Sequence, residues 1–202
     1  MKNGEKQDVY KVYNKIANWF AENRSTELME KSYLDQLINL LPIHAQVLDL
    51  GCGTGRPIFE HLISEGVNTI GIDASSAMLH IAKTNFPDET FILQDMRLLD
   101  LNKKFDAIIA WHSFFHLPSV DQPKMFELFE KHLHPNGILL FTSGTEKGEA
   151  WGMNGGENLF HASLATSDYE SLLAKHHFKI LNHVVKDPNC GYATVWMAQY
   201  TL

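Results

Sequence analysis

The chain has 202 residues, of which 45% are hydrophobic and 20% are charged. This length and composition are typical of one globular domain with a full core, so we expect a single domain over residues 1–202. The formal net charge is −7 and the basic residues are not clustered, which disfavours nucleic acid and anionic membranes as partners.

No stretch approaches the about 18 consecutive apolar residues of a membrane span, and the N-terminal residues are polar and of mixed charge rather than signal-like. Cys52 and Cys190 are the only cysteines, too few for a disulfide framework. We therefore expect a cytoplasmic protein.

Two amphipathic helices are predicted before the first strand. Apolar residues recur at helical spacing between Val9 and Phe20 and again between Leu34 and Leu41, and Pro42 ends the second helix.

Short apolar strands then alternate with helices. Strands are predicted at residues 46–50, 68–72, 90–93, 105–110 and 137–141, and helices at 57–66, 75–85 and 121–133. Nearly continuous apolar strands separated by helices are typical of a parallel sheet that is covered on both faces. The sequence therefore predicts a doubly wound α/β fold.

The C-terminal part has a different pattern. A helix is predicted at residues 167–175, followed by strands at 178–186 and 192–200 around a turn rich in Pro, Asn and Gly. Such a turn joins antiparallel strands, so the sheet should end in an antiparallel hairpin. Residues 143–157 are rich in glycine and polar side chains and are predicted to form a mobile surface segment.

The most informative stretch is the glycine loop Val47–Gly55 between a predicted strand and a predicted helix. Its glycines allow a sharp turn and a close approach of the backbone to a ligand. Asp73 ends the second strand 22 residues after Gly51, where a carboxylate can accept both hydroxyls of a ribose. Asp49 would repel a pyrophosphate but suits a cationic group. The pair indicates a nucleoside ligand with a positive group and no phosphates.

Val47–Gly55 resembles the first motif of the class I S-adenosylmethionine-dependent methyltransferases, and the similarity extends from about Tyr10 to the end of the chain. Further segments resemble the later motifs of that family in the same order: Asn68–Ser75, Leu93–Met96, Phe105–Ala110 and His134–Leu139. The resemblance implies a Rossmann-like seven-stranded sheet, mostly parallel with an antiparallel C-terminal strand. It also implies S-adenosylmethionine as cofactor and S-adenosylhomocysteine as product.

The same resemblance implies a set of cofactor-binding residues. Asp95 would meet the adenine amino group and Met96 would cover the ring, while Cys52 would be a small turn residue rather than a nucleophile. The full set is Arg24, Asp49, Gly51, Cys52, Gly53, Gly55, Asp73, Ala74, Met78, Asp95, Met96 and Trp111.

In many small-molecule methyltransferases an N-terminal segment closes over the cofactor. By this resemblance residues 1–42 would form a helical lid over a core of residues 43–202, with Arg24 pairing with the methionine carboxylate. Tyr13 and Trp19 are either lid residues or ordinary amphipathic packing.

Transfer of a methyl group from a sulfonium mainly requires alignment and exclusion of water, and a base only where the acceptor must lose a proton. His112 and His116, which follow the fourth strand, are candidates for acceptor binding or proton removal, although His116 could instead anchor the next helix. His161 is a candidate base or a packing residue at a helix start. No Cys, Asp or Glu motif completes a metal site with these histidines, so none is expected.

The sequence thus predicts a methyltransferase that acts on a small-molecule acceptor, as a monomer or homodimer. Two alternatives stay open: a dinucleotide-binding oxidoreductase and a cofactor-binding module without turnover. Asp49 and the antiparallel final hairpin disfavour the oxidoreductase. Protein acceptors are not excluded.

Overall fold

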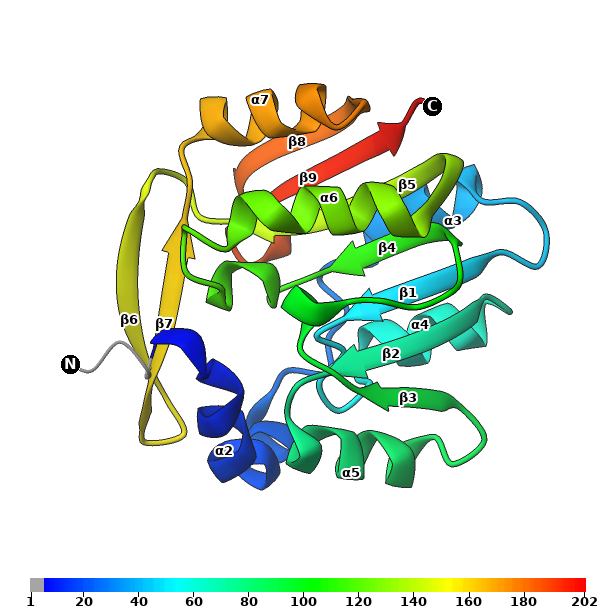
Figure 1. Ribbon diagram of the computed structural model, residues 1–202. Coiled ribbons are helices and arrows are strands. Elements are labelled where there is room, and N and C mark those ends of the chain that lie inside the picture. Colours follow the sequence, from blue (N-terminus) through cyan, green and yellow to red (C-terminus); the bar gives the residue numbers. More distant parts are fainter. Residues whose placement is uncertain (1–5) are drawn as a thin grey trace.

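The computed structural model describes residues 6–202. Its main feature is a seven-stranded sheet in the order β3-β2-β1-β4-β5-β9-β8 (Figure 1). The strands are β1 (Gln46–Leu50), β2 (Asn68–Asp73), β3 (Thr90–Leu93), β4 (Phe105–Ala110), β5 (Leu133–Ser143), β8 (Phe178–Asp187) and β9 (Ala193–Tyr200). Strand β9 runs antiparallel to both of its neighbours, β5 and β8, and the other pairings in this sheet are parallel. The predicted mostly parallel sheet with an antiparallel C-terminal strand is confirmed.

Six helices accompany the strands in the described part of the chain: α2 (Val9–Asn23), α3 (Lys31–Leu40), α4 (Ile58–Ser64), α5 (Ser76–Asn85), α6 (Gln122–His132) and α7 (Thr166–Lys175). Local sequence accounts for several of their ends. The Ser75 hydroxyl accepts a hydrogen bond from the Met78 N–H and so caps α5. Helix α4 begins directly after Pro57, and α3 ends just before Pro42.

The two faces of the sheet are covered by different helices because successive strand residues point to opposite sides. Val47, Ile109 and Leu140 pack with α3 and α4 in one buried cluster. Their neighbours Leu48, Ile108 and Leu139 pack with α6 and α7 in another. This two-sided burial explains why the strands read as nearly continuous apolar runs.

The expectation of a mobile surface segment at residues 143–157 is wrong. Strand β5 continues to Ser143, and β6 (Gly148–Asn154) pairs with β7 (Glu157–Ser163) in an antiparallel hairpin. The hairpin turns at Gly155 and Gly156, both with positive φ. Leu159, Phe160 and Ala162 of β7 are buried in one cluster with Val9 of α2, and Trp151 of β6 packs against this cluster, so contacts that are not local in sequence stabilise the hairpin.

No helix within residues 6–202 combines the length and the apolar character needed to cross a bilayer.

Candidate active site

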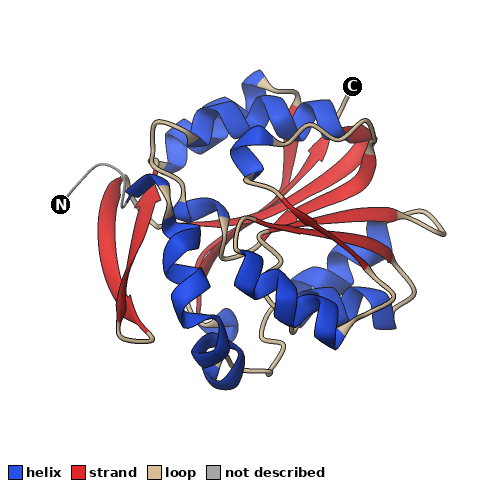
Figure 2. Ribbon diagram, turned by 60° about the horizontal axis from the view of Figure 1, so that its bottom comes forward, coloured by secondary structure: helices blue, strands red, loops and turns tan. Residues whose placement is uncertain are grey.

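A cavity of about 330 Å³ lies at the carboxyl ends of the parallel strands. Ligands of open α/β sheets bind at this edge, where the strand order reverses, here between β1 and β4. The strands β1, β2 and β4 point toward α2 and the β6–β7 hairpin (Figure 1). Figure 2 shows the hairpin beside α2 and apart from the main sheet, and both contribute residues to the wall of the cavity.

The glycine loop forms the floor of the cavity. The Gly51 N–H donates to the Ile72 carbonyl at 2.7 Å, and a Cβ on Gly51 would lie 2.2 Å from the Cβ of Ser113. The Ser113 hydroxyl in turn donates to the Leu50 carbonyl at 2.6 Å. Gly51 therefore permits the loop after β4 to lie directly on the loop after β1.

The other two loop glycines have different surroundings. Gly53 has a φ of +56° and its open side faces empty space, which suits a close approach by a ligand. Gly55 does not border the cavity: a Cβ there would lie 2.8 Å from the Phe86 ring. Its position indicates a packing role between the loop and α5, in place of the direct ligand contact expected from sequence.

Asp73 is held in place by the glycine loop. One carboxylate oxygen accepts from the Gly53 N–H at 2.9 Å, and the other accepts from the Ser75 N–H at 2.7 Å. Burial raises the pKa of Asp73, and these backbone hydrogen bonds oppose the increase. Each oxygen keeps a further lone pair, so the fixed carboxylate can still accept two hydroxyl protons from a ligand.

Asp49 is a buried carboxylate, 3% exposed, that borders the cavity. Within residues 6–202 no side chain or backbone group forms a hydrogen bond or ion pair with it. Burial and the charge of Asp73 raise the pKa of Asp49 to about 7, although the cation of Arg24 opposes this. A buried, unpaired carboxylate is unfavourable unless a cation reaches it. Asp49 therefore suits a ligand with a positive group.

Two further cavity residues lie near the N-terminal helices. The Arg24 guanidinium contacts Glu30 at 3.4 Å, and Glu30 is only 2% exposed. Trp111 is 4% exposed, and its indole N–H has no hydrogen-bond partner among residues 6–202. A buried donor without a partner is costly, which is consistent with a ligand acceptor at this position.

Another part of the cavity wall is built around His116. Its Nδ1 lies 2.8 Å from the Phe160 carbonyl oxygen, which can only accept, so Nδ1 carries the proton. Nε2 is then the acceptor for the Tyr13 hydroxyl at 2.8 Å. Burial lowers the pKa of His116 to about 3, so the ring is neutral. His116 is thus fully hydrogen-bonded to two elements, β7 and α2.

His112 and His161 complete this part of the wall. The His112 backbone N–H donates to Thr142 Oγ1 at 2.9 Å, and burial lowers the pKa of its ring to about 4. The His161 ring lies 4.7 Å from the His116 ring, between centroids, and burial lowers its pKa as well. His161 lies on β7, so the alternative role at a helix start is wrong. No group of three or more metal-ligating side chains gathers within the described residues.

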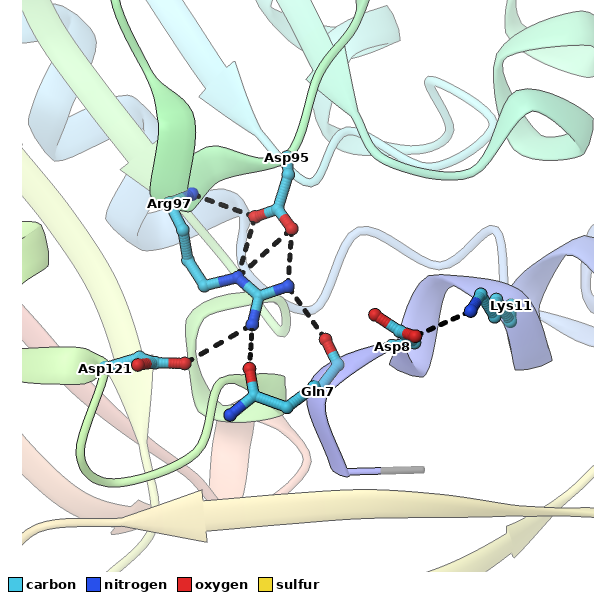
Figure 3. Close-up of polar contacts among 6 residues, drawn as sticks. All are labelled: Gln7, Asp8, Lys11, Asp95, Arg97 and Asp121. Atoms are coloured by element: carbon cyan, nitrogen blue, oxygen red, sulfur yellow. Dashed lines mark hydrogen bonds and ion pairs between the residues drawn. The ribbon is translucent and has the colours of Figure 1, made fainter. Parts of the chain in front are cut away.

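Asp95 and Met96 border the cavity at the end of β3, next to Arg97. The Asp95 carboxylate is held by three N–H groups of Arg97, and Arg97 also contacts Gln7 and Asp121 (Figure 3).

Most of the candidate residues therefore meet in one cavity. Its wall includes all of them except Gly55: Arg24, Asp49, Gly51, Cys52, Gly53, Asp73, Ala74, Met78, Asp95, Met96, Trp111, His112, His116 and His161. Sequence reasoning missed the wall residues Gln7, Tyr10, Arg97 and Leu159. Arg97, two residues after Asp95, had the clearest local signal, because a basic side chain that close to a site carboxylate can pair with it.

Comparison with known proteins gives a family match over the central part of the chain. A family model described as a methyltransferase domain matches residues 47–137. An uncharacterized methyltransferase of Oceanobacillus iheyensis is 28% identical over 152 residues, which make up 74% of this chain and 64% of that protein. The dTDP-3-amino-3,4,6-trideoxy-alpha-D-glucopyranose N,N-dimethyltransferase of Streptomyces venezuelae is 33% identical over 101 residues, 49% of this chain and 42% of the relative. The chain spans less than two thirds of the length of these two relatives.

Solved structures share the fold at low sequence identity. An S-adenosylmethionine-dependent methyltransferase from Clostridium acetobutylicum superposes with a TM-score of 0.74 and 19% identity, over 95% of this chain and 100% of that one. The CcbJ methyltransferase from Streptomyces caelestis gives a TM-score of 0.75 and 15% identity, over 98% and 99%. The matched segment 47–137 contains the glycine loop, Asp73, Asp95 and the loop after β4, all of which contribute residues to the cavity wall. Residues 47–137 therefore match a methyltransferase domain, and the chain has the fold of solved S-adenosylmethionine-dependent methyltransferases.

Proposed function

We propose that this protein transfers the methyl group of S-adenosylmethionine to a small, uncharged acceptor molecule and releases S-adenosylhomocysteine. The observation that carries the proposal is the unpaired Asp49 carboxylate, buried in the cavity beside the anchored Asp73 and the open face of Gly53. This arrangement fits a ligand with both a ribose and a positive group. When bound, the cofactor supplies a methyl group that is already activated by its sulfonium.

The basic residues of the cavity argue against a pyrophosphate ligand. Each of the three arginines on the wall already has a carboxylate partner: Arg24 with Glu30 at 3.4 Å, Arg56 with Glu60 at 3.2 Å and Arg97 with Asp95 at 2.5 Å. A diphosphate would therefore meet the carboxylates of Asp49 and Asp73, and Arg24, which is shared with Glu30, could offset a single carboxylate but not the larger charge of a diphosphate. This disfavours the dinucleotide-binding alternative.

We assign roles to the cofactor side as follows. Asp73 accepts the ribose hydroxyls, Asp49 faces the positive groups, and Asp95 with Met96 borders the adenine. Arg24 and the unpartnered indole N–H of Trp111 serve the methionine carboxylate, and Ala74 and Met78 line the adenosine part. The buried positions of Asp49 and Trp111 support these roles, because both lack a partner within residues 6–202.

The acceptor side differs in charge. The wall residues from the loop after β4 and from the hairpin include no Asp, Glu, Lys or Arg. Its three histidines have lowered pKa values and are neutral, and Phe115 and Leu159 are apolar. This composition supports an uncharged acceptor that donates an N–H or O–H hydrogen bond. One sequence relative is named for N,N-dimethylation of a dTDP-linked amino sugar, whose amine is an uncharged N–H donor once it is unprotonated, although its diphosphate is charged.

Three broader proposals accompany this function. We propose that residues 1–42, of which 1–5 lie outside the described part of the chain, act as a lid on a single domain; the position of α2 on the cavity wall and the Lys15–Glu157 ion pair at 3.1 Å support this. We propose a reducing, cytoplasmic setting, supported by the two free thiols of the chain. We propose a monomer or homodimer without nucleic-acid partners, supported by the net charge of −7.

Two measurements test the function. Isothermal titration with S-adenosylhomocysteine and with NADH should show binding of the first only, and the reverse result would favour an oxidoreductase. Incubation with methyl-labelled S-adenosylmethionine and a metabolite extract should then yield a labelled small molecule. Binding of the product without any label transfer would favour a cofactor-binding module without turnover.

A further inference from the structure

The Arg97 guanidinium uses all five of its N–H protons (Figure 3). Nε is shared between the two Asp95 oxygens at 3.0 and 3.1 Å. Nη2 donates to Asp95 Oδ2 at 2.5 Å and to the Gln7 carbonyl oxygen at 2.8 Å. Nη1 donates to the Gln7 side-chain oxygen and to Asp121 Oδ2, the latter at 3.3 Å. One side chain therefore connects three segments of the chain.

Three of these residues, Gln7, Asp95 and Arg97, border the cavity. Gln7 lies just before α2, Asp95 follows β3, and Asp121 lies at the start of α6. Gln7 is exposed, so apolar burial does not fix it. Its two bonds to Arg97 hold the residues before α2 against the edge of the cavity where β3 ends.

The same contacts restrict Asp95. Three N–H protons of Arg97, from the backbone at 2.9 Å and from Nε and Nη2, occupy a carboxylate that has about four lone-pair positions. About one acceptor position is left. Asp95 is thus oriented by Arg97 and can accept a single further hydrogen bond.

We propose that Arg97 is a positioning residue that sets Asp95 to accept one N–H of the adenine amino group. Arg97 also couples that recognition to closure of the segment before α2. This inference rests on the proposed function, because it requires an adenosine ligand at Asp95. Without the guanidinium, Asp95 and Asp121 would repel each other and Gln7 would lose its anchor. A lysine offers three donors on a compact charge and cannot span Asp95, Asp121 and Gln7 together, so Arg97→Lys should not be conservative.

The test uses two ligands that differ only in the base. S-inosylhomocysteine carries a carbonyl where S-adenosylhomocysteine carries the amino group, so Asp95 would face an acceptor instead of a donor. Titration of the wild-type protein should show that S-adenosylhomocysteine binds roughly tenfold or more tightly than the analogue. This ratio of dissociation constants corresponds to the free energy of one hydrogen bond to a charged group. Arg97→Lys should reduce this preference to less than about threefold. Lys131→Gln, which removes an exposed ion pair to Asp100, is the control and should keep the wild-type preference.

A second readout follows the coupling. S-adenosylhomocysteine should slow tryptic cleavage after Lys6 and Lys11 in the wild type, while the inosine analogue should not. Gln7→Ala removes the side-chain bond to Nη1 but keeps the backbone carbonyl bond to Nη2, so it should reduce this protection and keep the ligand preference, and Arg97→Lys should lose both. If Arg97→Lys keeps the preference, or the wild type binds S-adenosylhomocysteine without discriminating against the analogue, the inference is wrong. If the wild type does not bind S-adenosylhomocysteine at all, the first titration rejects the proposed function itself.

Discussion

The Tyr13 hydroxyl and His116 Nε2 lie 2.8 Å apart although 103 residues separate them in the chain. Because the Phe160 carbonyl fixes the proton on His116 Nδ1, Tyr13 must be the donor. Burial raises the pKa of Tyr13, so the phenol stays protonated at neutral pH. The lone pairs of its oxygen then remain as acceptors on the cavity wall. We therefore expect His116 to act through Tyr13, as a positioning residue, and not as a free base.

Tyr13→Phe removes the hydroxyl and should lower kcat for methyl transfer by about tenfold. This factor corresponds to the free energy of one neutral hydrogen bond or slightly more. Binding of S-adenosylhomocysteine should change by less than about twofold, because the Tyr13 hydroxyl is bonded to His116 in the loop after β4, on the proposed acceptor side. The control is Tyr10→Phe, since Tyr10 also borders the cavity but its hydroxyl has no hydrogen-bond partner within residues 6–202. Equal losses in both variants would contradict the role of Tyr13.

Asp49 should give the protein a measurable pH dependence. Its pKa is about 7 in the folded protein against an ordinary value of 3.8, so folding favours the protonated form between these pH values. Above about pH 7 Asp49 is ionised in the folded protein, and its buried charge lowers the free energy of unfolding by the full amount. Below about pH 4 Asp49 is protonated in both states and has no such effect. Asp49→Asn should raise the free energy of unfolding at pH 8, by up to about 4 kcal/mol, and change it little at pH 4. Urea unfolding at the two pH values measures this difference.

The same substitution should weaken cofactor binding. Wild-type affinity for S-adenosylmethionine should rise as the pH increases through about 7, because ionised Asp49 attracts the cation. Asp49→Asn should bind at least tenfold more weakly at pH 8 and lose this dependence. His116, whose pKa is about 3, should contribute no inflection between pH 5 and 9. If Asp49→Asn changes neither the free energy of unfolding nor the affinity for S-adenosylmethionine at pH 8, Asp49 does not face the ligand.

The sheet and the cofactor side could be predicted from sequence because their signals are local. Strand β1, the glycine loop and Asp73 lie within 28 consecutive residues, 46–73, and their pattern of apolar strand, turn and carboxylate is continuous. The hairpin was not predicted because β6 has no regular alternation of apolar and polar residues, and because its partner strand β7 is buried against α2, which is distant in sequence. The Arg97 cluster was missed for a related reason: Gln7 lies 90 residues away and Asp121 lies 24 residues away.

The glycine loop offers a comparison that separates folding from binding. Gly51→Ala would place a Cβ 2.2 Å from Ser113 Cβ at a φ of +78°, so the loop after β4 must move. We expect a loss of about 3 to 5 kcal/mol in the free energy of unfolding, from positive-φ strain and overpacking together.

Gly53→Ala meets no atom within 4 Å at a φ of +56°, so it should cost only about 1 to 2 kcal/mol of stability. Its methyl group would occupy the open face of the loop, where the proposed ligand lies, and should weaken S-adenosylhomocysteine binding by at least about tenfold. Thermal unfolding and isothermal titration of both variants give the two quantities. If Gly53→Ala binds S-adenosylhomocysteine as tightly as the wild type, the ligand does not approach this loop. Within the described residues no atom lies within 4 Å of the added carbon, so only a ligand could contact it.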